Sequence, residues 1–279
     1  MIKLLAVYTV LGLAAALHAQ SPNCRPLPGA DSLRSRSGLR FILVGEMHGT
    51  AETPQSFRDL VCAAQSAKRP LVVGIERPAR EQKAIDVFLA PEDHAAAVRG
   101  LLAEPGWKVL DGRSSQAMLT LLEELRAFQL KGNIAGVIAF DGVQTGDSAA
   151  QREQRMASIL TAAADRRPDC LVIVLTGNLH ASKKPVARFG SYPWMAMLLP
   201  PAETVSLLAT DQGGEAWTQM TDGCRPHPLR STGGERRGVT LAEPAAVERG
   251  YDGTLSTGSP STASLPAVPD APPPPACSK

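Results

Sequence analysis

The chain has 279 residues, 44% of them hydrophobic, which is enough for one large domain with a sizeable core. Its formal net charge is only +2, and basic and acidic residues are equal in number once the two ends of the chain are set aside. This balance excludes the basic surface typical of nucleic-acid-binding proteins, so no nucleic acid is expected as a partner.

The first 19 residues have the pattern of a secretory signal peptide. They carry one charge, Lys3, then an apolar stretch, and end in small residues near Ala19. We expect export to the periplasm or the extracellular space, with no stable membrane span after cleavage; a retained anchor is the alternative. Residues 20–37 form a short lead segment.

Export makes disulfides admissible for the five cysteines. None belongs to a Cys-x-x-Cys pair, which argues against a zinc ribbon or a thioredoxin-like motif. Four of them flank or lie in the folded body and allow three pairings: Cys24, Cys62, Cys170 and Cys224. Cys277 is expected to be the odd one out.

Buried apolar runs alternate with amphipathic segments between residues 38 and 222. Strands are predicted at 41–44, 71–75, 134–140, 171–175 and 204–209, with an edge strand at 216–220. Helices are predicted at 53–67, 78–89, 91–102, 117–130 and 148–164, and residues 107–110 form an extended link. This alternation predicts a single α/β domain, with a mainly parallel sheet of five or six strands, helices on both faces and a cleft at the carboxyl ends of the strands. Residues 223–279 are rich in Pro, Gly and Ser and are predicted to be disordered.

Two of these strands end in a Gly-x-x-His unit, FILVGEMH at 41–48 and LVIVLTGNLH at 171–180. Parallel strands deliver the residues that follow them to one edge of the sheet. We therefore expect His48, His180 and the strand-end Glu76 to lie within about 10 Å of one another.

Two kinds of chemistry suit this set of residues. The catalytic candidates are His48, His180, Glu46 and Glu76. They can act as a general base oriented by a carboxylate, or His48, His180 and Glu76 can hold a divalent metal with an open position for water.

Further polar residues at the same edge are candidates for substrate binding: Glu52, Asp141, Asn178 and Arg77. Glu52 is equally well explained as an acid at a helix N-terminus, and Arg77 as a surface charge. For any single strand-end histidine, a structural role is the simpler interpretation, and the repeated context is what favours a site.

The segments GEMHGTAETP, VVGIERP, REQKAIDVFLA and GNLHA resemble the erythromycin esterase-like and ChaN-like superfamily, whose distant relatives include the Tiki and TraB proteins. The resemblance covers residues 38–222. Its esterase members imply catalysis by His48 with Glu46, Glu52 and Glu76, and its Tiki-like members imply a metal near His48 and His180.

ChaN-like members imply haem bound through a tyrosine. After signal removal only Tyr192, in SYPWM, and Tyr251 remain, so haem ranks below a divalent metal as a cofactor. The long helical insertions of macrolide esterases are missing, so a macrolide is not expected. Two hypotheses follow: an exported hydrolase of an ester, amide or lactone bond in a small molecule or peptide, or a non-catalytic haem or metal carrier of the cell envelope.

Overall fold

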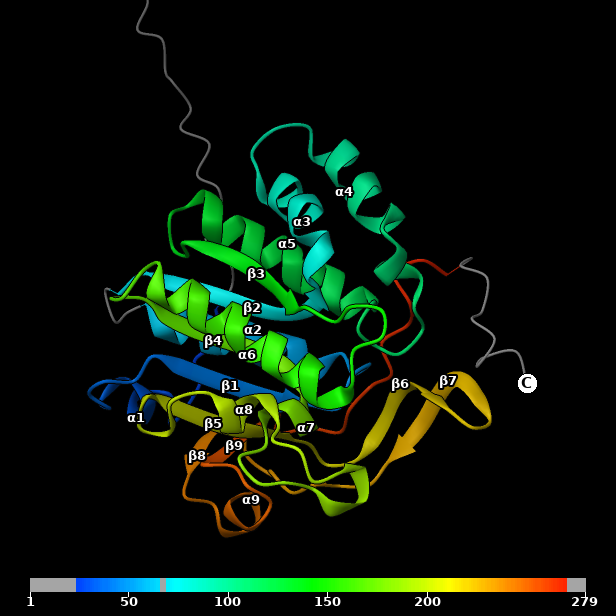
Figure 1. Ribbon diagram of the computed structural model, residues 1–279. Coiled ribbons are helices and arrows are strands. Elements are labelled where there is room, and N and C mark those ends of the chain that lie inside the picture. Colours follow the sequence, from blue (N-terminus) through cyan, green and yellow to red (C-terminus); the bar gives the residue numbers. More distant parts are fainter. Residues whose placement is uncertain (1–23, 66–68, 270–279) are drawn as a thin grey trace, which may run out of the picture.

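The computed structural model describes residues 24–65 and 69–269, and its central feature is a seven-stranded sheet (Figure 1). The strand order is β3-β2-β4-β1-β5-β9-β8. All neighbours are parallel except β8 and β9. The strands are β1 (Phe41–Glu46), β2 (Leu71–Pro78), β3 (Gly136–Asp141), β4 (Leu171–Gly177), β5 (Thr204–Thr210), β8 (Gly238–Leu241) and β9 (Gly253–Ser256). The predicted α/β fold is confirmed, with one strand more than the largest number expected.

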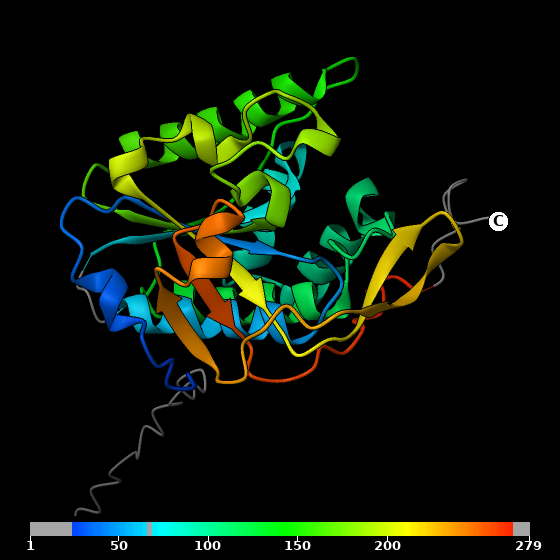
Figure 2. The same ribbon diagram turned by 90° about the horizontal axis from the view of Figure 1, so that it is seen from below.

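Helices cover both faces of the sheet, and the view from below in Figure 2 separates the two layers. Ile42 and Val44 of β1 face one layer, whereas Phe41 and Leu43 face the other. The first layer contains α2 (Glu52–Gln65), α3 (Gln82–Leu89), α4 (His94–Ala103) and α5 (Gln116–Leu130). The second contains α6 (Ala149–Asp165), α7 (Asn178–Ala181), α8 (Met195–Leu198) and α9 (Pro244–Glu248). Burial on both faces explains why the central strands are continuous apolar runs.

Some helix and strand boundaries differ from those predicted from local backbone signals. Pro78 ends β2, past a bulge, instead of starting a helix, and a 3₁₀ turn, Ala79–Glu81, precedes α3. The expected link at 107–110 overlaps a 3₁₀ helix, Pro105–Lys108. Two more 3₁₀ turns occur at Ala187–Phe189 and Pro201–Glu203. Of the two cap candidates for α6, Asp147 and Ser148, the structure has Ser148, in a capping box with Gln151.

The prediction that residues 223–279 are disordered is wrong for the part that the structure describes, up to residue 269. β8, α9 and β9 extend the main sheet beyond β5, and Leu255 of β9 is fully buried. β7 (Gly223–Leu229) pairs antiparallel with β6 (Gly214–Met220), so the predicted edge strand belongs instead to a hairpin that projects from the domain (Figure 1). Composition misled because this segment builds no core of its own: it adds strands and a few apolar side chains to an existing one.

The segment after β9 crosses the molecule as an extended strap, residues 257–269. It bridges to Thr50, near the end of β1, and to Ser115, at the start of α5. The carboxylate of Glu52 accepts a hydrogen bond of 2.8 Å from the amide of Thr262. The strap thus fastens the loop that follows the first Gly-x-x-His unit.

The lead segment also belongs to the domain. Leu27, Ala30 and Leu33, around the short helix α1 (Asp31–Arg34), pack into the core. Cys24 forms a disulfide with Cys62 of α2, with Cα atoms 5.8 Å apart. Cys24–Cys62 is one of the predicted pairings, but Cys170, at the start of β4, is a free and buried thiol.

Cys224 is disulfide-bonded too. Cys277 and the predicted signal peptide, residues 1–19, lie outside the described residues. Among the helices that are described, none combines the length and hydrophobicity needed to cross a bilayer.

Two leucines of the segment predicted to be disordered give a direct test of the fold. Leu255→Ala should cost about 2–5 kcal/mol of unfolding free energy, because it leaves a cavity in the core. Leu265→Ala, at a side chain that is 50% exposed, should stay within about 0.5 kcal/mol of wild type. Urea unfolding followed by circular dichroism measures both, and equal effects would contradict the position of β9 in the sheet.

Candidate active site

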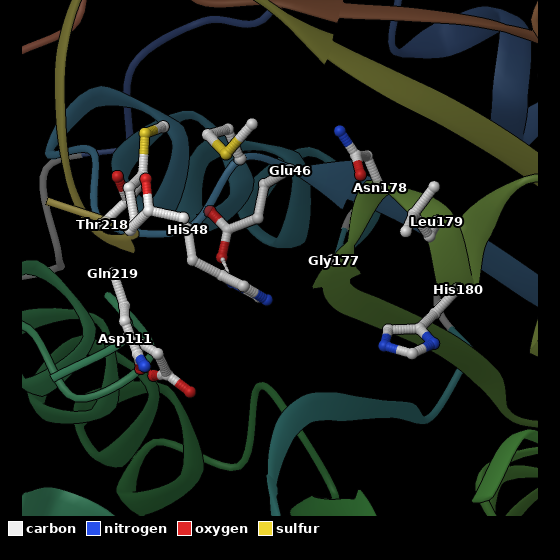
Figure 3. A pocket seen from close by; sticks show the side chains of 12 residues that line it. Glu46, His48, Asp111, Gly177, Asn178, Leu179, His180, Thr218 and Gln219 are labelled. Carbon is white, nitrogen blue, oxygen red and sulfur yellow. Dashed lines mark hydrogen bonds and ion pairs between the residues drawn. The ribbon is translucent and has the colours of Figure 1, made fainter. Parts of the chain in front are cut away.

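The two Gly-x-x-His units meet because β1 and β4 are adjacent parallel strands, with Glu46 opposite Gly177. They line a cleft of about 760 Å³ at the carboxyl edge of the sheet, where His48 and His180 lie on opposite sides (Figure 3). The tip of the β6–β7 hairpin forms the outer rim. The cleft is lined by Glu46, Met47, His48, Asp111, Gly177, Asn178, Leu179, His180, Thr218, Gln219, Met220 and Thr221.

Glu76, at the end of β2, lies between the two histidines. Its Oε2 is 3.6 Å from Nε2 of His48, and its Oε1 is 3.6 Å from Nε2 of His180. The sequence-based expectation that these three residues converge is thus met. Sequence alone did not indicate that Glu76 would be 5% exposed and located in the middle of the site.

Both oxygens of Glu76 are held by hydrogen bonds. Oε2 accepts from the hydroxyl of Thr176 at 2.7 Å and from the amide of Gly177 at 2.6 Å. Oε1 accepts from Arg113 at 3.2 Å and from Arg152 at 3.0 Å. Burial works to raise the pKa of Glu76, but the positive charges of His48 and Arg113 outweigh it and hold the pKa well below its usual range.

His48 forms a pair with Glu46, the last residue of β1. Nδ1 of His48 lies 2.9 Å from Oε1 of Glu46, so that Nε2 points into the cleft. Burial works to lower the pKa of His48, yet the charges of Glu76 and Glu46 prevail and raise it to about 10. Burial also raises the pKa of Glu46. At neutral pH, therefore, His48 is protonated in the resting site.

His180, on the other side of the cleft, is held at both ring nitrogens. Nδ1 lies 2.7 Å from Oε1 of Glu153, a buried residue of α6 whose other oxygen accepts from the amide of Met195. Nε2 lies 3.2 Å from Nη1 of Arg152. Because arginine only donates, this contact places the ring proton of His180 on Nδ1. His180 and Glu153 therefore fix the position of the Arg152 guanidinium.

Asp141, at the end of β3, anchors the two arginines from behind. It accepts hydrogen bonds from Nε and Nη2 of Arg152 at 3.0 and 2.9 Å, and from Nη1 of Arg113 at 3.1 Å. Burial works to raise its pKa, but the bonds from Arg152 lower it. Asp111 holds Arg113 from the other side at 2.6 Å. Asp141 is thus a support for the arginines and does not line the cleft.

The sequence did not indicate Arg113, Glu153 or Asp111, and it left Arg152 open as a surface charge or an anion binder. Arg152 and Glu153 lie in the first turns of α6, the helix that follows β3, where a strand-end site receives helix residues. Arg113 comes from the loop before α5 and had no comparable signal.

Two predicted binding residues lie outside the cleft. Glu52 bonds to the strap, as described above. Arg77 is 1% exposed, pairs with Glu81 at 2.7 Å and stacks on Trp107, with its guanidinium carbon 4.3 Å from the ring centroid. Its Nη1 donates to the carbonyl of Arg113, so it supports the loop that carries Arg113. Asn178 does line the cleft.

The arrangement does not fit a metal on His48, His180 and Glu76. Within residues 24–65 and 69–269, no group of three or more His, Cys, Asp or Glu side chains is placed to hold a metal ion. Glu76 already accepts four hydrogen bonds, and two arginines beside it would repel a cation. Haem binding through Tyr192 stays a prediction: its ring packs on Trp194 with centroids 4.9 Å apart, and it does not line the cleft.

The raised pKa of His48 predicts a specific pH dependence of stability. A folded-state pKa of about 10 against 6.5 for the free side chain means that this stabilisation is complete below about pH 6.5 and is lost as the pH rises toward 10. The urea concentration at the midpoint of unfolding of the wild type should thus decrease as the pH is raised from about 7 to 9.5. In His48→Gln it should decrease less steeply. His94→Gln, at a histidine paired with Glu123 outside this cluster, should keep the wild-type slope. Equal slopes in all three proteins would contradict the charge arrangement around His48.

Comparisons with known proteins show the fold. No family model matches the chain, and no curated protein does. Among solved structures, a mutant of the erythromycin esterase EreC in its open conformation is similar with a TM-score of 0.61 and 11% identity, over 84% of this chain and 93% of that one. The type III effector HopBA1 is similar with a TM-score of 0.52 and 15% identity, over 88% of this chain and 100% of that one.

A protein from Bacillus cereus is similar with a TM-score of 0.52 and 11% identity, over 82% of this chain and 90% of that one. A closer relation to ChaN-like or Tiki-like proteins stays a prediction. At these identities the likeness concerns the fold alone: the chain shares the α/β fold of an erythromycin esterase and of the effector HopBA1.

Proposed function

We propose that the protein is an exported hydrolase of an ester, amide or lactone bond, in which His48 activates water. The observation that carries this proposal is the geometry of His48: Glu46 holds its Nδ1, and its Nε2 faces an open cleft. A carboxylate that orients an imidazole in this way is the usual arrangement of a general base. When His48 is deprotonated, Nε2 can take a proton from a water molecule in the cleft.

Positive charge lies beside the cleft, where Arg152 contacts His180. The side chain of Arg152 is 26% exposed, and its position is fixed by Asp141, Glu76 and His180. Hydrolysis of a carbonyl compound builds negative charge on the carbonyl oxygen, and a preorganised cation stabilises that charge. We assign this role to Arg152, with His180 as its positioning residue.

Two further observations support the finer parts of the proposal. The disulfides at Cys24–Cys62 and at Cys224 agree with an oxidising compartment and hence with export. The fold shared with an erythromycin esterase makes hydrolysis a reasonable first assay.

A panel of p-nitrophenyl esters, anilides and lactones tests the assignment. On any substrate found, His48→Ala and His180→Ala should each lower kcat/KM by about 10²-fold or more, and the double variant should be little worse, because residues of one catalytic unit act non-additively. His94→Ala, a histidine outside the cleft, is the matched control. Wild-type turnover in folded His48→Ala, or no turnover of any substrate, would leave a carrier protein as the better interpretation.

The pH–rate profile tests the role of His48 separately. With a pKa of about 10, only about one His48 in 10³ is deprotonated at pH 7, so kcat/KM should rise roughly tenfold per pH unit up to about pH 9. Glu46→Gln removes a charge that raises this pKa and should shift the limb to lower pH. Glu52→Gln, which removes a carboxylate outside the cleft, should not. If Glu46→Gln left the pH dependence of kcat/KM unchanged, His48 would be ruled out as the titrating base.

A further inference from the structure

A second groove, of about 630 Å³, adjoins the catalytic cleft. Met47, Asn178 and Leu179 line both, so the groove and the cleft are neighbours that share these residues. The hydroxyl of Tyr251 donates a hydrogen bond of 2.6 Å to the carbonyl of Asn178, which fixes this shared segment. Neither the catalytic chemistry nor the similar structures assign a role to this groove.

Five of the residues that line the groove are apolar. They are Leu179, Pro185 and Val186, together with Met47 and Phe189, which are 43% and 44% exposed. Large apolar side chains left in water cost free energy, and covering them is favourable. The groove therefore favours a ligand with an apolar body.

The groove also carries positive charge. Lys184, Arg188 and Arg249 line it against a single acid, Glu248. The ammonium of Lys184 donates to the carbonyls of Val247 and Glu248.

Arg188 and Arg249 form no salt bridge with any residue of the described chain. The guanidinium carbon of Arg188 lies 4.6 Å from the ring centroid of Phe189. Two unpaired guanidinium groups beside an apolar surface are suited to an anion carried on an apolar chain.

The catalytic cleft, by contrast, carries both signs of charge: Glu46 and Asp111 line it together with His48, and Arg152 lies beside His180. These charges offset one another, whereas the groove has three cations against one acid. An anionic group is therefore favoured in the adjoining groove.

We propose that the groove binds the anionic end of the substrate, an apolar chain that ends in a carboxylate or a phosphate, while the bond to be cleaved lies at His48. This inference rests on the proposed hydrolase function for the orientation of the substrate. Binding of the anionic chain itself does not depend on turnover, so the two can be tested separately.

Direct binding is the first test. Calorimetry with octanoate and octyl phosphate, which separate a carboxylate from a phosphate as the preferred group, should detect binding that the octyltrimethylammonium cation does not show. The double variant Arg188→Gln/Arg249→Gln should weaken binding about three- to tenfold, as expected for two partly exposed ion pairs. Raising the salt to about 0.5 M should weaken wild-type binding as well.

The matched control removes two exposed arginines elsewhere. Arg166→Gln/Arg167→Gln lies between α6 and β4, at the amino edge of the sheet, and should bind as the wild type does. Equal binding of anion and cation, or equal loss in both double variants, would overturn the groove proposal.

Turnover is the second test. Mono-p-nitrophenyl esters of adipic and suberic acid carry a carboxylate at the end of the acyl chain, whereas the hexanoate and octanoate esters do not. The wild type should prefer the charged ester about three- to tenfold in kcat/KM, and Arg188→Gln/Arg249→Gln should lose this preference while still hydrolysing the neutral esters. If turnover depends on His48 but shows no preference for the charged ester, the groove proposal is overturned and the hydrolase proposal stands. If binding depends on the arginines but no ester, anilide or lactone is turned over, the groove proposal stands and the hydrolase proposal is overturned.

Discussion

The buried carboxylate of Glu76 is the feature on which the site depends. A charge in this position is costly unless it is fully compensated, and four donors from three segments of the chain provide the compensation: Thr176, Gly177, Arg113 and Arg152. Each donor is fixed in turn, Arg152 by Asp141 and His180, and Arg113 by Asp111. Glu76 thus connects β2, β4, the loop before α5 and the start of α6 into one rigid floor.

The same charge decides the protonation of the site. Glu76 and Glu46 together raise the pKa of His48, whereas the guanidinium of Arg152 keeps the ring proton of His180 on Nδ1. Two histidines with the same sequence context therefore have different partners and different proton arrangements. One is suited to exchange a proton with a ligand, and the other to hold a cation in place.

The C-terminal segment completes this arrangement from outside. The tip of the β6–β7 hairpin forms the rim of the cleft, and Tyr251, just before β9, holds Asn178, which lines both the cleft and the adjoining groove. The strap after β9 bridges to Thr50, in the loop that follows His48, and bonds to Glu52, the first residue of α2. The cleft is thus bordered by the last third of the chain, while its histidines come from the first two thirds.

The sequence by itself determined the α/β class, the alternation of strands and helices, and the meeting of His48, Glu76 and His180, because apolar periodicity and strand-end position are local signals. It did not determine the partners of these residues. Contacts between segments far apart in the chain place Arg113, Arg152 and Glu153 in the site. Contacts of the same kind hold Arg77 and Glu52 outside the cleft. Only the tertiary structure decided that residues 223–269 are ordered, because their stability comes from edges and surfaces that the rest of the fold provides.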